Sequence, residues 1–312
     1  MRKKAIICIL SLLIGSDLFS QLQEEPLTLE TRSGMIQGTL LFPTSSQKMP
    51  LAIIISGSGP TDRDGNNPMM KNNGLKMLAE GLSGHGIASL RYDKRGIAAS
   101  AKAGPREEEI RFETYIEDAK AWAAFLKRDP RFSEIVMIGH SEGSLIGMIA
   151  SREGTVSKFI SMAGTGFPAG DIIQTQLKAQ APFLLDQAGP IIDSLEGGQA
   201  VDSIPPMLFS LFRPSVQPYL ISWFKYDPAQ ELSTLDKPIL IVQGSTDIQV
   251  DVANARQLAQ SNPKAELKIF EGMNHILKES VVDAQMNMMT YNDPELPLKE
   301  GLVAALAEFI NR

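Results

Sequence analysis

Short apolar runs alternate with helical segments along most of this 312-residue chain, and this alternation constrains its fold more than any other feature. The runs 51–55 and 134–138 are continuous enough to be strands that are buried on both faces. Strands that alternate with helices predict an α/β fold, with a mostly parallel central sheet and helices on both of its faces. Ser33-Gly34 indicates a hairpin between the first two strands. The expected strands are 26–31, 35–42, 51–55, 87–91, 134–138, 158–162, 238–242 and 266–270, and the expected helices are 74–82, 107–127, 144–150, about 252–260 and 302–310.

One long segment, 167–236, interrupts the alternation because it contains no strand-like run. Prolines divide this segment into several amphipathic helical pieces. It is therefore predicted to be a helical cap inserted over the carboxyl ends of the strands. The core would then consist of residues 21–166 and 237–312.

The first twenty residues have the pattern of an export signal. A basic head at 2–4 precedes the apolar run 5–15, and a more polar exit at 16–20 follows. The apolar run is too short for a stable membrane anchor, and a signal of this kind is removed after export. Residues 1–20 are thus predicted to be cleaved before Gln21, which implies a periplasmic or extracellular protein. The alternative is a short buried N-terminal helix.

Charge and cysteine content exclude several classes of function. Three basic residues and one acid lie in the predicted signal, so the mature chain would keep 27 basic and 35 acidic residues. An acidic chain without a basic stripe is a poor candidate for binding nucleic acid or an anionic membrane. The single cysteine, Cys8, also lies in the signal. The mature chain would therefore have no disulfide, no cysteine nucleophile and no cysteine-ligated metal.

The pentapeptide from Gly139 to Gly143 fits the G-x-S-x-G pattern of a nucleophile elbow. It follows a predicted buried strand and precedes a helical pattern, which is the context that this motif requires. In such an elbow a tight turn exposes the serine hydroxyl, and side chains at the two glycine positions would collide across the turn. Ser141 is therefore the candidate nucleophile.

A serine hydroxyl needs a base, and this chain contains only three histidines. His275 follows the last predicted strand, so it lies at the carboxyl edge of the sheet with Ser141. His140 is expected to point away from the catalytic face, and His85 lies where a strand begins. His275 is therefore the candidate base.

The base in turn needs an acid to orient it. Asp247 follows the strand 238–242, and the chain order Ser141, Asp247, His275 is the order found with this kind of elbow. Asp251 is the competing acid, although its place before an expected helix is typical of an N-cap.

The oxyanion of an acyl-transfer intermediate needs backbone N–H donors. One candidate is the N–H of Glu142, directly after the nucleophile, and the other is that of Ser58 or Gly59 in the loop after the strand 51–55. Pro60 has no N–H to offer.

Five runs of the chain together have a recognisable pattern: 57–65, 91–96, 139–143, 246–250 and 273–275. In these runs the chain resembles bacterial α/β-hydrolase carboxylesterases, which are similar in fold to serine aminopeptidases and acyl thioesterases. The resemblance implies an α/β-hydrolase fold, a serine esterase activity and no cofactor. Two positions depart from the pattern, because Ala98 replaces a usual glycine and Asp251 a common proline.

The acids in 62–66 have a spacing that faintly resembles a calcium loop, but the distal glutamate is missing. Arg63 and Asp64 are instead expected to brace the oxyanion loop through ion pairs, and Arg91, Asp93 and Arg95 are expected to be structural. No metal site is therefore predicted.

The leading interpretation is hydrolysis of a small-molecule ester with a short or medium acyl chain through an acyl-enzyme. A peptidase is the alternative, in which Glu142 or an acid of the cap (Asp171, Asp186 or Glu196) would bind a free amine. A non-catalytic binding protein on the same fold is a third interpretation. Apolar cap residues would line the acyl site in the leading interpretation. They are Phe183, Met207, Phe209, Phe212, Tyr219 and Trp223.

Overall fold

A central eight-stranded sheet organises the molecule, which is a computed structural model that describes residues 22–312. The strand order is β1-β2-β4-β3-β5-β6-β7-β8. β1 pairs antiparallel with β2, β2 pairs antiparallel with β4, and the other neighbours are parallel. The predicted export signal, 1–20, lies outside the described residues. The strands are β1 (Leu22–Thr31), β2 (Gly34–Pro43), β3 (Met49–Ile55), β4 (Ala88–Tyr92), β5 (Phe132–His140), β6 (Lys158–Met162), β7 (Ile239–Gly244) and β8 (Glu266–Phe270).

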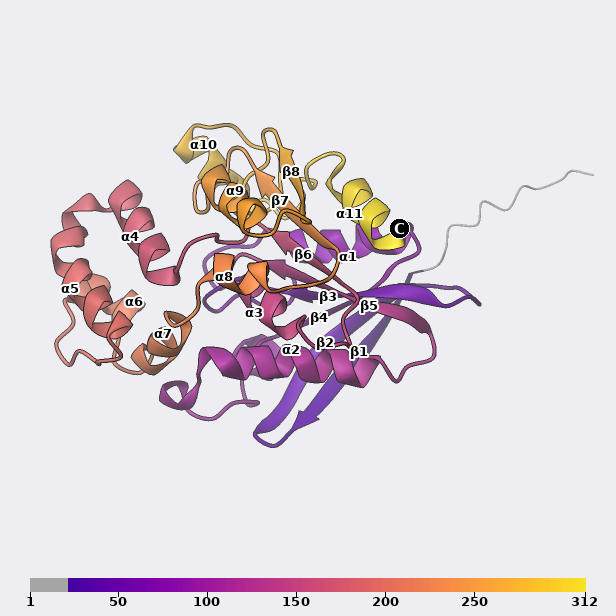
Figure 1. Cartoon of the computed structure of the whole chain (residues 1–312), viewed down its shortest axis with the longest axis horizontal. Coiled ribbons are helices and arrows are strands. Elements are labelled where there is room, and N and C mark those ends of the chain that lie inside the picture. The colour runs from indigo at the N-terminus through magenta and orange to yellow at the C-terminus, as the bar shows by residue number, and fades with distance from the viewer. Residues whose placement is uncertain (1–21) are drawn as a thin grey trace, which may run out of the picture.

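Helices cover both faces of this sheet, as Figure 1 shows, so the predicted fold class is confirmed. The α-helices are α1 (Gly74–Gly84), α2 (Phe112–Leu126), α3 (Glu142–Ala150), α4 (Ala169–Gln180), α5 (Leu185–Glu196), α6 (Phe209–Phe212), α7 (Gln217–Trp223), α8 (Pro228–Ser233), α9 (Val252–Ser261), α10 (Ala284–Met289) and α11 (Leu302–Asn311). Short 3₁₀ turns are Ala98–Ser100, Glu107–Glu109, Pro182–Leu184, Pro206–Leu208 and Thr290–Asn292.

The central strands supply side chains to two separate apolar clusters. Successive residues of a strand point to opposite faces of the sheet. Ile135 and Met137 of β5 join the cluster under α2, α3, α8 and α9, whereas Val136 and Ile138 join the cluster under α1 and α11. A strand buried on both faces must be apolar at every position, which explains the continuous apolar runs in the sequence.

The helix expected over 107–127 is broken near its start. Glu107–Glu109 forms a 3₁₀ turn, and the α-helix begins only at Phe112. The hydroxyl of Thr114 accepts a hydrogen bond from the Arg111 N–H at 3.2 Å, which satisfies a donor at the new helix start. Arg213 also forms an ion pair with Glu107 and holds the pKa of that carboxyl below its usual value. The prediction of one continuous helix was therefore wrong.

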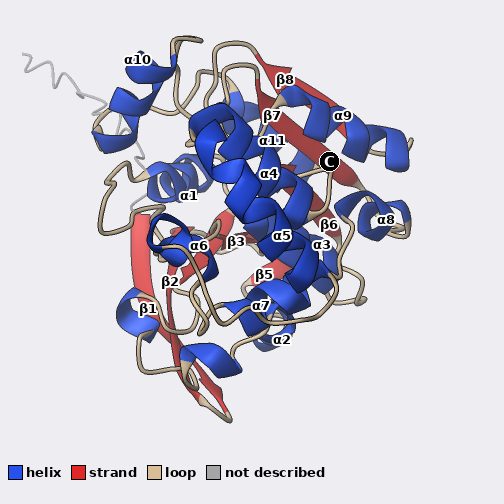
Figure 2. Ribbon diagram, turned by 90° about the vertical axis from the view of Figure 1, so that its left-hand side faces the viewer, coloured by secondary structure: helices blue, strands red, loops and turns tan. Residues whose placement is uncertain are grey.

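The inserted segment forms α4 to α8 between β6 and β7. In Figure 1, α4 to α7 lie to the left of the sheet, and in Figure 2 α4, α5 and α7 lie in front of it. These helices have an apolar cluster of their own, which includes Leu184, Ile192 and Phe212. In the part of the chain that the structure describes, no helix is long and apolar enough to cross a membrane.

Candidate active site

Ser141 lies on a strained turn between β5 and α3. Its φ of 55° and ψ of −124° put it in a region that residues other than glycine rarely adopt. The neighbouring chain leaves no room for side chains at the two flanking glycines. A Cβ on Gly139 would overlap the carbonyl of Gly143, and a Cβ on Gly143 would overlap the carbonyl of Ile55 in β3. The strain persists only because the surrounding structure enforces it, which is typical of a functional position.

His275 and Asp247 are in direct contact, as the sequence predicted. His275 Nδ1 donates to Asp247 Oδ2 at 2.8 Å, and both side chains are buried. Because the Nδ1 proton is held by the carboxylate, Nε2 of a neutral imidazole is free to accept a proton. His275 and Ser141 line the same cavity.

The Ser141 hydroxyl has no hydrogen-bond partner in the described part of the chain. In unliganded sites, catalytic hydrogen bonds are often long and tighten only when substrate binds. The structure thus brings the acid and the base together and places the candidate nucleophile beside them.

Four donors converge on the Asp247 carboxylate. Besides His275, Gln243 Nε2 donates to Oδ2 at 2.9 Å, and the backbone N–H groups of Gln249 and Val250 donate to Oδ1 at 2.8 and 2.9 Å. Burial alone would raise the pKa of Asp247, but the charge of His275 and these hydrogen bonds hold that pKa below its usual value. Asp247 is therefore a carboxylate at neutral pH.

The competing acid, Asp251, and one of the two rejected histidines, His85, lie where the sequence predicted. Asp251 caps α9, and its side chain accepts from the Asn254 N–H at 3.4 Å. His85 follows α1 at the amino end of β4 and is exposed.

His140 does not point away from the catalytic face, so that expectation was wrong. Its Nε2–H donates to the backbone carbonyl of His275 at 2.7 Å, and the two ring centroids are 4.8 Å apart. The side chain of a strand residue alternates in direction, but at the last residue of β5 the chain is already turning into the elbow. His140 thus supports the loop that carries His275.

A cavity of about 210 Å³ opens beside Ser141. Its walls come from the loop between β3 and α1 and from the segment after β8. Among its lining residues, all within the described chain, there is no Asp or Glu. The lining residues are Gly57, Ser58, Thr61, Gly65, Asn67, Met70, Asn72, Gly74, Leu75, His140, Ser141, Gln249, His275, Ile276, Leu277 and Tyr291.

The six predicted cap residues do not line this cavity. Phe212 is fully buried in the cluster of the inserted helices. Trp223 stacks on Phe112 of α2, and the Tyr219 ring packs on Phe112 at a tilt. Phe183, Met207 and Phe209 are 66%, 63% and 51% exposed. Apolar residues in a small helical insertion are needed to hold it together and to fix it on the core, so their chemistry alone did not identify a substrate wall.

The inserted helices nevertheless reach the acid loop. Gln176 of α4 donates from Nε2 to the backbone carbonyl of Gln249 at 3.1 Å. Gln249 also donates from its own Nε2 to the Tyr291 hydroxyl at 3.1 Å.

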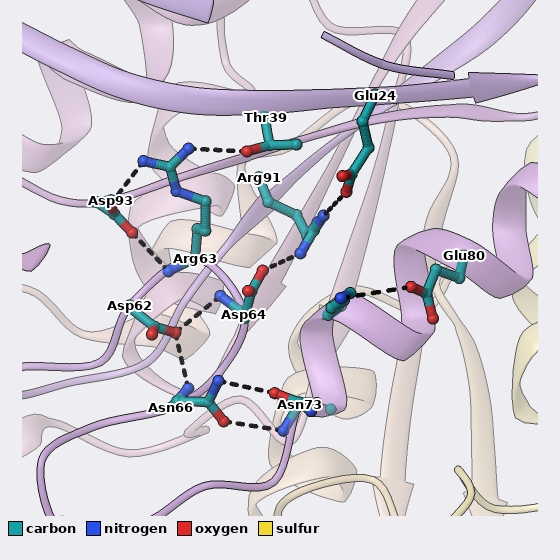
Figure 3. Close-up of polar contacts among 12 residues, drawn as sticks. Glu24, Thr39, Asp62, Arg63, Asp64, Asn66, Asn73, Glu80, Arg91 and Asp93 are labelled. Carbon is teal, nitrogen blue, oxygen red and sulfur yellow. Dashed lines mark hydrogen bonds and ion pairs between the residues drawn. The ribbon is translucent and has the colours of Figure 1, made fainter. Parts of the chain in front are cut away.

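The loop that carries Ser58 is pinned by the ion pairs that the sequence predicted. Arg63 donates to Asp93 at 2.7 Å, and Arg91 forms an ion pair with Asp64, as Figure 3 shows. Asp62 accepts from the backbone N–H groups of Asp64 and Asn66, both at 2.9 Å. Ser58 lines the cavity, whereas Gly59 lies outside its lining. In the described chain, no group of three or more His, Cys, Asp or Glu residues is placed to hold a metal ion.

Comparisons with known proteins agree with this architecture. The family model described as "Serine aminopeptidase, S33" matches residues 72–188. Est1E from Butyrivibrio proteoclasticus aligns with a TM-score of 0.60 at 18% identity, covering 92% of this chain and 99% of Est1E. GrgF, an α/β-hydrolase from Penicillium, aligns with a TM-score of 0.60 at 22% identity, covering 93% of this chain and 98% of GrgF. The chain has an α/β-hydrolase fold.

A relative in sequence is the esterase EstD from Thermotoga maritima. It is 28% identical to this protein over 246 residues, which is 78% of the chain. The chain spans 58% of the length of EstD.

Several residues of the candidate site were not predicted. Gln243 is a fully buried polar residue in an otherwise apolar strand, and that contrast is a signal that the sequence contains. Lys94 is also buried, but it lies in a run of charges, 91–95, where nothing distinguishes it from its neighbours. Gln249 lies in the run 246–250 on which the resemblance rests, although nothing in that run indicates its place in the cavity. Tyr291 has no local signal, since it meets the cavity only through the tertiary fold.

Acid is expected to destabilise the protein through His140. Burial, and then the charge of His275, lowers the pKa of His140 to about 4 from an ordinary value of 6.5. Between these two values the unfolded chain binds more protons, so the stability is present above pH 6.5 and is lost as the pH falls toward 4. From pH 7 to pH 5 the free energy of unfolding should fall by about 2 kcal/mol through this group.

The measurement is urea unfolding at both pH values for the wild type and for His140→Gln, whose amide can keep the donor to the His275 carbonyl. Between pH 7 and pH 5 the fall in the free energy of unfolding should be about 2 kcal/mol smaller in the variant than in the wild type. Equal losses in the two proteins would show that His140 is not the group concerned.

Proposed function

We propose that this protein is an exported esterase of the α/β-hydrolase family that cleaves short-chain carboxylic esters through an acyl-enzyme on Ser141. The observation that carries the proposal is the shared cavity, in which a serine on a strained elbow lies beside a histidine held by a buried carboxylate. The similarity to EstD, which is named as an esterase, supports the same reaction class.

Each residue of the site has one role in the proposed reaction. His275 Nε2 takes the hydroxyl proton of Ser141 while Oγ attacks the ester carbonyl carbon. The oxyanion that forms is held by the N–H groups of Ser58 and Glu142. The C–O bond to the alcohol then breaks, and His275 returns the proton to the leaving oxygen. Water repeats these steps on the acyl-enzyme and releases the acid.

The charge of the cavity favours an ester over a peptide. An aminopeptidase would need an anionic group to bind the free amine of its substrate. The cap acids considered for that role, Asp171, Asp186 and Glu196, belong to the inserted helices and are absent from the cavity lining, and Glu142 is absent from it too.

The size of the cavity favours a short acyl group. About 210 Å³ is below the roughly 300–1,000 Å³ that is usual for sites of drug-sized ligands. Hydrolysis of p-nitrophenyl esters should be fastest between acetate and butyrate, and kcat/KM should fall by about tenfold or more at decanoate, because a long chain cannot be buried beside Ser141. The same assay with an amino-acid p-nitroanilide measures the peptidase alternative.

The expected result is a rate on the anilide at least about 100-fold below that on the butyrate ester. A preference for the anilide would overturn the ester proposal in favour of a peptidase. A rate that rises with chain length would instead show that the acyl group binds outside this cavity.

Export rests on the pattern of residues 1–20, with a basic head before a short apolar run. The mass of the protein recovered after expression with its full sequence tests this part of the proposal. A protein that keeps residue 1 in a secreting host would contradict it.

A further inference from the structure

Lys94 is a buried cation beside the candidate site that the proposed reaction does not use. It follows β4, and its side chain is only 2% exposed. Its ammonium donates to the backbone carbonyl of Gly57 at 2.5 Å and lies 3.4 Å from a carboxylate oxygen of Glu142. It also lies 5.2 Å from the centre of the Tyr115 ring. Burial of a lysine is costly, so a position of this kind requires a compensating set of contacts.

The carbonyl of Gly57 belongs to the same peptide unit as the N–H of Ser58. A trans peptide is planar, and its C=O and N–H point in opposite directions. A contact that fixes the Gly57 oxygen therefore also fixes the direction of the Ser58 N–H. Hydrogen bonds in a chain polarise one another, so a cation on the oxygen also makes the N–H a stronger donor.

Lys94 also contacts the residue that carries the second candidate donor. The Glu142 carboxyl is buried, and its second oxygen has no hydrogen-bond partner within the described chain. Burial raises the pKa of Glu142 and the charge of Lys94 opposes that rise. One ammonium thus joins the peptide 57–58 to the first residue of α3.

Gly57 and Ser141 are also in close contact. A Cβ added to Gly57 would lie 3.1 Å from the Cβ of Ser141, which is tighter than almost all real contacts. The peptide that Lys94 holds is therefore adjacent to the candidate nucleophile, where a small rotation would change the position of the Ser58 N–H relative to a bound ester.

We propose that Lys94 is a positioning residue for the oxyanion hole, which orients the Ser58 N–H through the Gly57 carbonyl and anchors Glu142 through its carboxylate. This inference rests on the proposed esterase function. Lys94 does not touch the substrate, and its effect is on the donors that stabilise the transition state. The ion pairs of Arg63 and Arg91 hold a more distant part of the same loop (Figure 3), whereas Lys94 contacts the donor peptide itself.

Lys94→Met is the main test, because methionine has a similar length and no charge. With p-nitrophenyl butyrate we expect kcat to fall by about 10²-fold while KM stays within about threefold, since a donor for the oxyanion acts on the transition state rather than on the ground state. Inhibition by a trifluoromethyl ketone, whose adduct with Ser141 Oγ carries the oxyanion, should weaken by a similar factor. If Lys94 had a purely structural role, its loss would not lower kcat and weaken inhibition by the ketone by similar factors.

A second variant removes the buried carboxylate that Lys94→Met would leave unpaired. Lys94→Met with Glu142→Gln should fold more stably than the single variant but keep its low kcat. Lys94→Arg, which keeps a cationic donor, should recover part of the activity. A double variant with the kcat of the wild type would show that Lys94 only neutralises Glu142, and would overturn the inference.

Lys158→Met is the matched control. Lys158 donates to the Ile310 carbonyl at 2.5 Å and to Glu134 at 3.0 Å, so it has the same two kinds of contact at the opposite end of the sheet. The Lys158→Met substitution should lower the melting temperature without changing kcat. A wild type that hydrolyses no ester would contradict the proposed function, whereas an active wild type with an unchanged Lys94→Met variant would contradict only the role of Lys94.

Discussion

Replacing Ser141 by alanine should lower kcat for p-nitrophenyl butyrate by about 10⁴-fold or more, because loss of the nucleophile leaves only the oxyanion donors and substrate binding to accelerate the reaction. The burst of p-nitrophenol that marks formation of an acyl-enzyme should disappear with it. The structure predicts little change in folding. The Ser141 hydroxyl makes no hydrogen bond in the described chain, and alanine keeps the same Cβ against Gly57.

A fluorophosphonate probe and the melting temperature supply the controls for this variant. The probe should label the wild type once, on the peptide that contains Ser141, and should not label Ser141→Ala. An unchanged burst in the variant would exclude Ser141 as the nucleophile. A well-folded wild type that never reacts with the probe would instead support a non-catalytic binding protein.

Asp247→Asn should lower kcat by about 10⁴-fold with a much smaller change in KM. Every lone pair that Asp247 uses faces a donor: His275 and Gln243 on Oδ2, and two backbone N–H groups on Oδ1. An asparagine amide must direct its NH₂ at one of these two sets. If it meets His275, the imidazole must accept at Nδ1 and carry its proton on Nε2, where it cannot take the proton of Ser141.

Asp251→Asn is the matched control for this variant on the same loop. Asparagine is as good an N-cap as aspartate, so α9 should keep its start and kcat should stay within about twofold of the wild type. Steady-state kinetics on both variants, with the melting temperature as a check of folding, separates the two acids. If Asp251→Asn lost most of its kcat while Asp247→Asn stayed active, the catalytic acid would be Asp251 and not Asp247.

The parts of the fold and of the site that could be predicted from the sequence are those with local patterns. Runs such as 51–55 and 134–138 predict their strands because a strand with helices on both sides has no polar face. The contact between His275 and Asp247 followed from chain order, since loops after parallel strands meet at one edge of the sheet.

The parts that could not be predicted depend on distant contacts. His140 packs on His275 although 135 residues separate them, and Lys94 is held by Gly57, 37 residues away. The apolar residues of the inserted helices were also ambiguous, because cluster formation and substrate binding require the same side chains. Only tertiary packing decides between these uses.

The cavity and the two apolar clusters are built from almost separate sets of residues. Of the residues that line the cavity, only Leu75 and Leu277 also belong to the clusters described for the sheet. The lining positions that are not buried, such as Asn67 and Met70, can therefore change without a cavity or an overpacked site in the interior, which are the main sources of large destabilisation. Variation at these positions among descendants of such a chain can thus alter which ligand the cavity accepts while the thermal stability of the scaffold is retained.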